Sequence, residues 1–276
     1  MGFILPEFDR TRALAAFDDY VGNFNLVDQR IFLKYEHTME VAKLCEEIAT
    51  VNRMSSDDVD LVWLCGLLHD IGRFEQLQNW NTFRDSDSIS HAKLGVAVLD
   101  GKKTPGFDFI HENNLLVRFT KNAEWARVIR FAVGVHSDYK LPADLDFRTR
   151  GFCEILRDAD KIDIIRVFSQ NSCESVLELS SEKFIDGEIS DVAMTCFRDQ
   201  RCIGPHERKT HLDRLVGVAC LAFEIVNDSG IEALRKHEYM EDLINHPFGI
   251  DMSFTKRDTQ KKWNEISSSV RELVSK

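Results

Sequence analysis

Apolar residues recur along the chain at the three- and four-residue spacing of amphipathic helices, and no segment shows the strict alternation typical of a strand. In the first half this pattern predicts helices over Phe8–Phe24, Ile31–Val51, His91–Gly101, Asn122–His136 and Phe147–Gln170. In the second half it predicts helices over Ser180–Arg198, Lys209–Asn227, Gly230–Ile244 and Thr255–Ser275. We therefore expect an all-α fold.

A further helix is predicted within Leu61–Gln76, where the apolar run LVWLCGLL ends in His69 and Asp70. Gly72 is expected to end this helix, because glycine adopts a positive φ without a Cβ clash. A carboxylate at the negative end of a helix dipole is unfavourable unless a cation lies beside it. Asp70 in the last turn therefore suggests a bound cation. The polar stretch Leu77–Ser90 that follows is expected to be a functional loop.

Three more histidines occupy comparable positions on other predicted helices. His37 is the one polar member of an apolar stripe on Ile31–Val51. His91 begins a helix that Ser88 or Ser90 can cap. His136 is the polar residue at the C-terminal end of its apolar stripe. For any one of these residues, a core histidine bonded to a backbone carbonyl is the alternative interpretation.

Asp160 is the polar exception on the apolar face of the helix predicted over Phe147–Gln170. An ionised carboxylate in such a stripe is too costly to bury alone, so it needs a cation or hydrogen-bond donors. Asp158 is expected to lie on a more polar face of the same helix. Asp160 therefore joins the histidines as a candidate ligand.

Together these residues form one candidate metal site. Imidazole and carboxylate ligands suit a divalent transition metal (Fe, Mn, Co, Ni or Zn) rather than calcium. A set of this size with one bridging carboxylate suits two ions. A mononuclear site in which some of the histidines face substrate is the alternative. The candidate ligands are His37, His69, Asp70, His91, His136 and Asp160.

The chain resembles the HD-domain metalloenzymes, whose signature is a histidine, a His-Asp pair and a distant aspartate on a helical bundle. The matching residues are His37, then His69-Asp70 within LLHDIGR, then Asp160 within RDADKID. The resemblance implies an HD-domain bundle in which these four residues bind one metal ion. Members with two ions add two histidines, for which His91 and His136 fit, with Asp70 as the bridge.

Two branches of that family differ from this chain. Alarmone hydrolases have an acidic pair shortly after the His-Asp pair, where this chain has Arg73, Phe74 and Glu75. The cyclic-di-nucleotide branch has a second adjacent histidine, where this chain has Ser137 after His136. Neither specificity is carried over to this chain. The closest resemblance is to small bacterial HD-domain proteins assigned as hydrolases.

The resemblance implies a metal-dependent phosphohydrolase that cleaves a small phosphomonoester or phosphodiester, nucleotide-like, with metal-activated hydroxide. Asp70 would act in catalysis, and Arg73 and Lys161 would stabilise the developing charge. One alternative is a mixed-valent di-iron oxygenase of the HD-domain type, since the same ligands serve both chemistries. The other alternative is a non-catalytic ligand-binding module.

Composition narrows these classes further. A net charge of −11 argues against bulk nucleic-acid binding, and no apolar run approaches the roughly 20 residues that span a membrane. Seven dispersed cysteines without a CxxC pair suggest reduced thiols in a cytoplasmic protein. Without a repeat or linker in its 276 residues, we expect one domain over 1–276. Its core would span about 30–170 and a C-terminal helical extension about 171–276.

Overall fold

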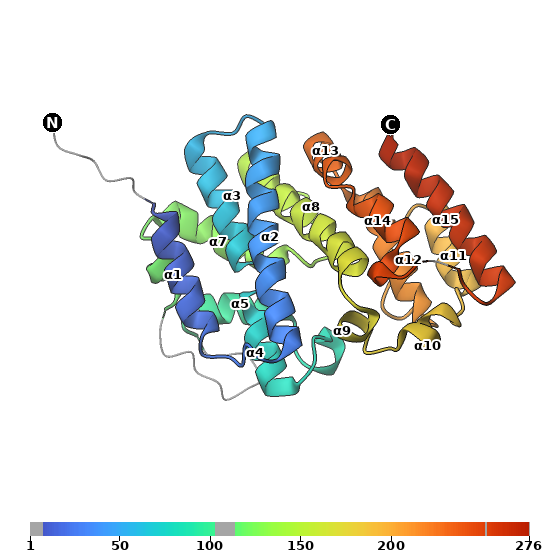
Figure 1. Cartoon of the computed structure of the whole chain (residues 1–276). Helices are drawn as coiled ribbons and strands as arrows, with labels where there is room; N and C mark the ends of the chain where they lie inside the picture. Colours follow the sequence, from blue (N-terminus) through green and yellow to red (C-terminus); the bar gives the residue numbers. More distant parts are fainter. Residues whose placement is uncertain (1–7, 103–113, 252, 276) are drawn as a thin grey trace. The chain divides into compact units, whose positions relative to one another are not determined.

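The computed structural model describes residues 8–102, 114–251 and 253–275 (Figure 1). Helices form all the regular structure of these residues, which confirms the predicted all-α fold. The chain divides into two compact units between Arg157 and Asp158, inside helix α8 (Phe147–Gln170). The expected single domain with a core ending near residue 170 stays a prediction.

The first unit places the elements that carry most of the candidate ligands. Helix α2 packs along α3, α4 packs against α5, and α5 and α3 both contact α7. Fully buried apolar side chains such as Phe17, Leu64 and Phe74 fill the space between these helices. The elements that precede α8 are α1 (Arg10–Val21), α2 (Gln29–Val51), α3 (Ser56–Leu68), α4 (Ile71–Trp80), η1 (Asp85–Asp87), α5 (His91–Asp100), α6 (Leu116–Phe119) and α7 (Ala123–Val135).

The prediction that this helix ends at Gly72 was wrong. Helix α3 ends at Leu68, and α4 begins at Ile71, so His69 and Asp70 lie in the interruption between two helices. Asp70 precedes the positive end of α4, where a carboxylate is favoured. The anomaly expected for its position is therefore absent, and α4 takes up the first part of the predicted Leu77–Ser90 loop.

Gly72 serves a different purpose from the expected helix stop. A Cβ atom on Gly72 would lie 2.4 Å from the carbonyl oxygen of His91 and 2.5 Å from the backbone nitrogen of Gly95. Real Cβ atoms essentially never approach so closely. Gly72 therefore allows the start of α4 to pack backbone to backbone against α5, which brings Asp70 near His91.

Predicted helix ends with clear capping residues were confirmed. The Ser90 hydroxyl accepts a hydrogen bond from the backbone N–H of Lys93 at the start of α5. Gly101 ends α5 with a φ of 63°. The Asn122 side chain caps α7 by accepting from two backbone N–H groups. These caps fix where His91 begins its helix and where α7, the helix that precedes His136, begins.

The second unit contains shorter helices than the sequence pattern predicts. Two predicted long helices are interrupted, for example near Gly187, where a Cβ would lie 2.6 Å from the ring of His211. In a third, helix α12 passes directly into the short helix η2. Helix α15 was predicted almost to its ends and buries Trp263. After α8 the elements are α9 (Cys173–Leu177), α10 (Ser181–Ile185), α11 (Asp191–Arg198), α12 (Leu212–Ala219), η2 (Cys220–Glu224), α13 (Asp228–Lys236), α14 (Tyr239–Asn245), η3 (Pro247–Gly249) and α15 (Arg257–Ser275).

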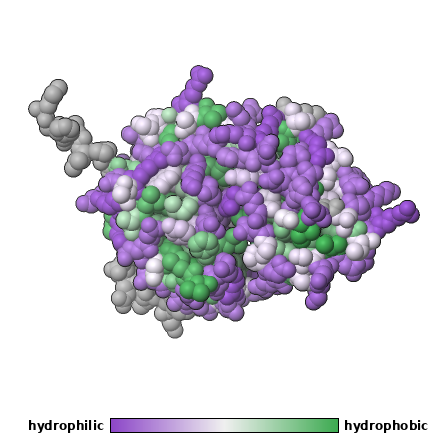
Figure 2. All heavy atoms as spheres, in the orientation of Figure 1, coloured by the Kyte–Doolittle hydropathy of each residue, from purple (hydrophilic) through white to green (hydrophobic). Residues whose placement is uncertain are grey.

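The exposed surface is largely hydrophilic on the face drawn in Figure 2, where hydrophobic residues form small separate patches. Among the described residues, no helix is both long and apolar enough to span a bilayer. All seven cysteines are free thiols, and six of them are buried, in agreement with the expected reduced core thiols. Burial raises the pKa of Cys153 and of Cys220 to about 12, so these thiols stay protonated at neutral pH.

Candidate metal centre

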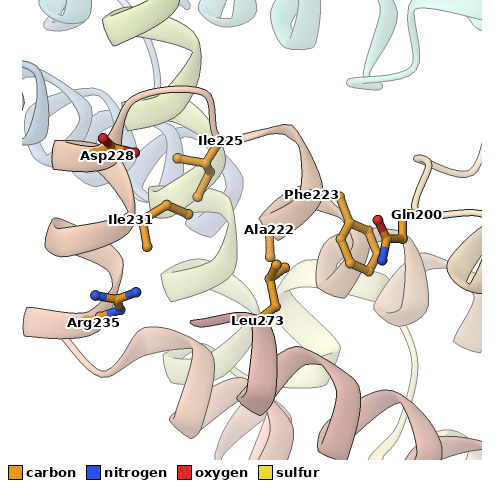
Figure 3. A pocket seen from close by; sticks show the side chains of 8 residues that line it. All are labelled: Gln200, Ala222, Phe223, Ile225, Asp228, Ile231, Arg235 and Leu273. Atoms are coloured by element: carbon orange, nitrogen blue, oxygen red, sulfur yellow. The ribbon is translucent and has the colours of Figure 1, made fainter. Parts of the chain in front are cut away.

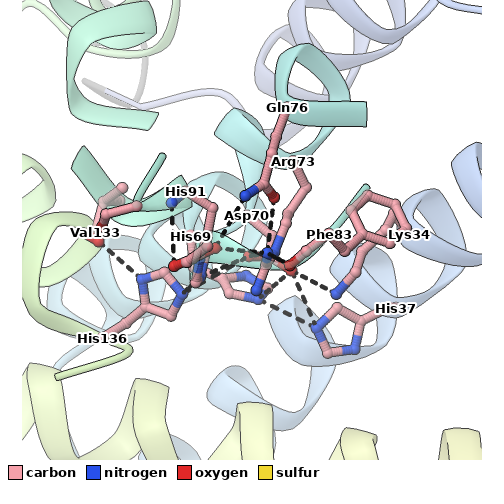
Figure 4. Close-up of polar contacts among 12 residues, drawn as sticks. Lys34, His37, His69, Asp70, Arg73, Gln76, Phe83, His91, Val133 and His136 are labelled. Carbon is pink, nitrogen blue, oxygen red and sulfur yellow. Dashed lines mark hydrogen bonds and ion pairs between the residues drawn. The ribbon is translucent and has the colours of Figure 1, made fainter. Parts of the chain in front are cut away.

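The first unit brings five of the six candidate ligands together in one buried cluster (Figure 4). The ligands converge from α2, from the interruption between α3 and α4, from the start of α5 and from the residue after α7. Each side chain is at most 5% exposed, so the cluster lies almost entirely out of water. The five residues are His37, His69, Asp70, His91 and His136.

Asp70 lies between two pairs of histidines and presents one carboxylate oxygen to each pair. Its Oδ2 atom is 3.6 Å from Nε2 of His37 and 3.7 Å from Nε2 of His69. Its Oδ1 atom is 3.5 Å from Nε2 of His91 and 3.7 Å from Nε2 of His136. This division of the two oxygens is the geometry that a bridging carboxylate needs.

The second ring nitrogen of three of these histidines is held by an acceptor outside the cluster. Nδ1 of His69 lies 2.7 Å from the carbonyl oxygen of Gly66, and Nδ1 of His136 lies 2.8 Å from that of Val133. Nδ1 of His91 lies 2.7 Å from a carboxylate oxygen of Asp85. Carbonyl and carboxylate oxygens only accept, so Nδ1 carries the proton in each ring and Nε2 offers its lone pair to the cluster.

The donor set fits divalent transition metals. Nε2 of His37 and His69 are 3.3 Å apart, and Nε2 of His91 and His136 are 3.0 Å apart. In each pair together with Asp70, one ligand atom from every residue lies within 4.8 Å of the others. Buried imidazole nitrogens that converge on a shared carboxylate are the ligand type that Fe, Mn, Co, Ni and Zn accept. Two such groups therefore give two candidate ion positions.

Asp70 is ionised in this environment. Burial raises the pKa of its carboxyl, but Lys34, His69, His136 and Arg73 outweigh burial and hold the pKa well below the usual range. Nζ of Lys34 makes the closest of these contacts, at 2.7 Å from Oδ2. A carboxylate that stays charged at neutral pH can serve as a metal ligand without first losing a proton.

His91 is neutral at neutral pH. Burial is the main reason why its pKa falls to about 4, and the positive charge of Arg73 lowers it further, against the opposing effect of Asp85. Burial also tends to raise the pKa of Asp85, but His91, Arg73 and Gln76 lower it to about 2. The result is a neutral imidazole beside an ionised carboxylate, which is the state in which histidine binds metals.

Arg73, a predicted catalytic residue, points into the cluster from α4. Its Nη1 atom donates to Gln76, to the carbonyl oxygen of Phe83 at 2.6 Å and to Asp85 at 3.0 Å. Its Nε atom is buried, lies 3.5 Å from Oδ1 of Asp70, and has no hydrogen-bond acceptor among the described residues. One donor of the guanidinium therefore lies beside the candidate ligand Asp70 without a hydrogen-bond acceptor of its own.

The other predicted residues belong to the second unit. Asp160 is half-buried on α8, and its role as a ligand stays a prediction. Lys161, the other predicted catalytic cation, donates from Nζ to the carbonyl oxygen of Glu224 at 2.8 Å. Its catalytic role also stays a prediction. The expectation that Asp158 lies on a polar face of α8 was wrong. Asp158 is fully buried and accepts hydrogen bonds from Val226 and Asn227.

A separate pocket lies in the second unit, with a volume of about 590 Å³ (Figure 3). Apolar side chains such as Phe223 and Ile231 line it together with Gln200, Asp228 and Arg235. It contains none of the candidate ligands. The chemistry expected from the sequence is therefore concentrated in the cluster of the first unit.

Sequence reasoning missed Lys34, Gln76 and Asp85, which contact the cluster. Lys34 lies one helical turn before His37, so its place on the same face of α2 was a usable signal. Asp85 and Gln76 had no comparable signal. Their contacts depend on how the segment between α4 and α5 folds back over α4, which helical periodicity does not encode.

Comparison with known proteins gives one match. Residues 35–132 match the family described as HD domain. The matched segment includes His37, His69, Asp70 and His91, and it ends before His136. Neither the curated proteins nor the solved structures gave a match to the chain.

Proposed function

This chain carries an HD domain, and we propose that it is a metal-dependent phosphohydrolase acting on a small phosphomonoester or phosphodiester, nucleotide-like. HD domains belong to a superfamily of metal-dependent hydrolases. The observation that carries the proposal is the position of Asp70, whose two oxygens face two different histidine pairs. A shared carboxylate between two nitrogen-rich positions suits a pair of ions that act on one phosphoryl group.

We assign the ligands to two positions. His37, His69 and Asp70 would hold the first ion. Asp160 would be the further ligand, as the resemblance of its sequence context to the HD-domain metalloenzymes implies. Asp70, His91 and His136 would hold the second ion. Bound divalent ions would supply a hydroxide near neutral pH, because they lower the pKa of coordinated water.

The cationic side chains of the cluster suit an anionic substrate. The Nε donor of Arg73 has no hydrogen-bond acceptor among the described residues and would be the donor offered to a phosphoryl oxygen beside Asp70, while its Nη1 atom anchors the guanidinium to the segment after α4. Lys34 adds a second positive charge at Asp70. Charge development on the phosphoryl oxygens would therefore meet a guanidinium that is already oriented.

Hydrolysis of chromogenic phosphate esters tests this proposal. We expect purified protein supplied with Mn²⁺ to hydrolyse p-nitrophenyl phosphate or bis-p-nitrophenyl phosphate, and chelation to abolish turnover. Asp70→Asn should lose activity, and Arg73→Lys should lose most of it, since a lysine cannot reproduce a guanidinium anchored and oriented in this way. Arg198→Lys, a surface ion pair on α11, is the matched control. Metal-loaded protein that is inactive on both esters and on a panel of nucleotides would refute the proposal.

A mixed-valent di-iron oxygenase is the second candidate. The observation that favours it is the nitrogen-rich donor set, four imidazoles around one carboxylate, which also suits iron. Iron-loaded protein would then consume oxygen in the presence of an organic substrate and would leave phosphate esters intact. Anaerobic hydrolysis with Mn²⁺ would exclude this second candidate as the main activity. A non-catalytic ligand-binding module would bind metal and show neither reaction.

A further inference from the structure

Asp85 connects several groups around the cluster although it is not itself a candidate ligand. Its Oδ2 atom lies 2.7 Å from Nδ1 of His91. Its Oδ1 atom accepts hydrogen bonds from Nη1 of Arg73 at 3.0 Å and from Nε2 of Gln76 at 2.9 Å. Oδ1 also lies 3.0 Å from Nδ1 of His91. One carboxylate therefore contacts both a metal-ligand candidate and the guanidinium of Arg73.

The contact with Asp85 distinguishes His91 from His69 and His136. His69 and His136 donate from Nδ1 to backbone carbonyls three residues earlier, which are fixed by their own helices. His91 is the first residue of α5, so no preceding helical turn offers it such a carbonyl. A carboxylate from the segment before α5 takes that place, and it polarises the imidazole more strongly than a neutral carbonyl does.

Gln76 fixes Asp85 in this position. Its side chain is fully buried, and its amide nitrogen donates to Asp85, to the hydroxyl of Ser88 and to the carbonyl oxygen of Ile89. Its amide oxygen accepts from Arg73 at 2.7 Å. The segment from Asp85 to Ile89 is thereby tied to α4, and the carboxylate is not free to turn away from His91.

We propose that Asp85 is a positioning residue: it holds His91 with its proton on Nδ1, presents Nε2 to the second ion, and orients Arg73 through the same carboxylate. This inference rests on the proposed metal-dependent function. It separates the two ion positions, because only the second position depends on a ligand that this segment orients. Asp85 itself touches neither ion nor substrate in this role.

The isosteric substitution Asp85→Asn tests the inference. The amide offers one oxygen acceptor, whereas the carboxylate faces Nδ1 of His91 with both oxygens, at 2.7 and 3.0 Å, and also accepts from Arg73 and Gln76 at Oδ1. We expect affinity for the second Mn²⁺ ion to fall by about 10–100-fold, while the first ion keeps the wild-type affinity. Calorimetric titration of metal-free protein with Mn²⁺ resolves the two steps. Asp85→Glu, which keeps both oxygens, should retain more of the second affinity than Asp85→Asn.

Asp87→Asn is the matched control, because it makes the same chemical change in the same short helix. Asp87 is exposed and contacts Ser86 and Arg84. We expect the Asp87→Asn protein to bind both Mn²⁺ ions with the affinities of wild type. Equal second-ion affinities in wild type and Asp85→Asn would overturn the inference, as would an equal loss in Asp87→Asn.

Nuclear magnetic resonance of the metal-free protein gives a second readout that a general loss of stability does not mimic. Two-bond ¹H–¹⁵N correlation spectra distinguish a proton on Nδ1 from one on Nε2. We expect His91 to lose its Nδ1–H pattern in Asp85→Asn, while His69 and His136 keep theirs. The His91 signals are identified by their absence in His91→Gln. An unchanged His91 pattern in Asp85→Asn would overturn the inference.

Failure of the proposed function gives a different result from failure of this inference. Wild-type protein that binds two Mn²⁺ ions and hydrolyses no phosphate ester would refute the phosphohydrolase proposal, while weaker second-ion binding in Asp85→Asn would still support the role of Asp85. Active wild-type protein with an unaffected second ion in Asp85→Asn would refute only the inference. Wild-type protein that binds no Mn²⁺ would overturn both.

Discussion

His91 and His136 bring their Nε2 atoms to within 3.0 Å of each other although they are 45 residues apart in the chain. Both rings donate from Nδ1 to other acceptors, so in their neutral forms the two facing nitrogens carry lone pairs rather than protons. Facing lone pairs repel each other at this distance. A cation that both nitrogens share removes the repulsion, and Oδ1 of Asp70 supplies the negative charge beside it.

Metal content of single variants should separate the two ion positions. We expect His91→Ala to lower the metal content from about two ions per chain towards one, because the first position keeps its ligands. His37→Ala should weaken the first position instead. Asp70→Ala should weaken both, since its loss leaves two cations close together without a shared negative charge. Elemental analysis of protein purified without chelator measures these contents; equal values for wild type and His91→Ala would refute a two-ion site.

Removal of metal should destabilise the protein. A ligand that binds the folded state at about 1,000 times its dissociation constant adds about 4 kcal/mol to the free energy of unfolding. We therefore expect a chelator to lower the melting temperature of wild type and to have little effect on Asp70→Asn, which has lost the shared ligand. Thermal unfolding with and without chelator measures the difference. An unchanged melting curve would show that the histidines are satisfied core residues.

The close approach of α4 and α5 at Gly72 predicts a sensitive position. Gly72→Ala would place a methyl group against the backbone of His91 and Gly95, so we expect a loss of about 1–3 kcal/mol and weaker metal binding. Gly151→Ala on α8 is the control, because a Cβ there meets nothing within 4 Å and alanine is the better helix former. Urea denaturation compares them. Equal stability of the two variants would contradict this account of the helix packing.

Much of the fold could be predicted where local chemistry marks a helix end. Ser90 and Asn122 offered caps and Gly101 offered a stop, so α5 and α7 were located closely. The interruption at residues 69–70 was missed because the apolar spacing continues across it, from Leu68 to Ile71. Periodicity alone cannot reveal a break that preserves the buried face.

The ligands of the site were easier to predict than the residues that orient them. His37 and His136 were conspicuous because each is a polar side chain on an apolar stripe, and both are buried in the cluster. Asp85 lies in an exposed polar segment where one more carboxylate is unremarkable. Its importance comes from the contact with His91, which exists only once α4, α5 and the segment between them have packed together.

Stability of the metal-free protein should depend on pH through His91. Its pKa is about 4 in the folded protein and about 6.5 in an unfolded chain, so between these values only the unfolded chain binds the proton. The free energy of unfolding should therefore rise with pH from about 4 to about 6.5, by up to about 3 kcal/mol from this group. Urea denaturation in chelator measures the slope. His91→Gln should show a smaller slope; equal slopes would contradict the prediction.

Replacement of Asp158 and replacement of Asp160 should affect different properties, although both residues lie close together on α8. Asp158→Ala leaves the backbone N–H groups of Val226 and Asn227 without their buried acceptor, so we expect a loss of about 2–3 kcal/mol with metal stoichiometry unchanged. Asp160→Ala should weaken the first ion and leave the stability in chelator nearly unchanged. Calorimetric metal titration of both variants measures the effect on metal binding, and urea denaturation measures the effect on stability. A reversed pattern would remove Asp160 from the ligand set.

The two-residue interruption between Leu68 and Ile71 also limits how this site could be transplanted by protein design. In an unbroken α-helix, neighbouring side chains point about 100° apart, so adjacent residues cannot both face one centre. Here His69 follows the last residue of one helix and Asp70 precedes the first residue of the next, and their side chains converge (Figure 4). A grafted copy of the same residues on a straight helix would direct the imidazole and the carboxylate to different places. The interruption between the two helices would therefore have to be copied with them.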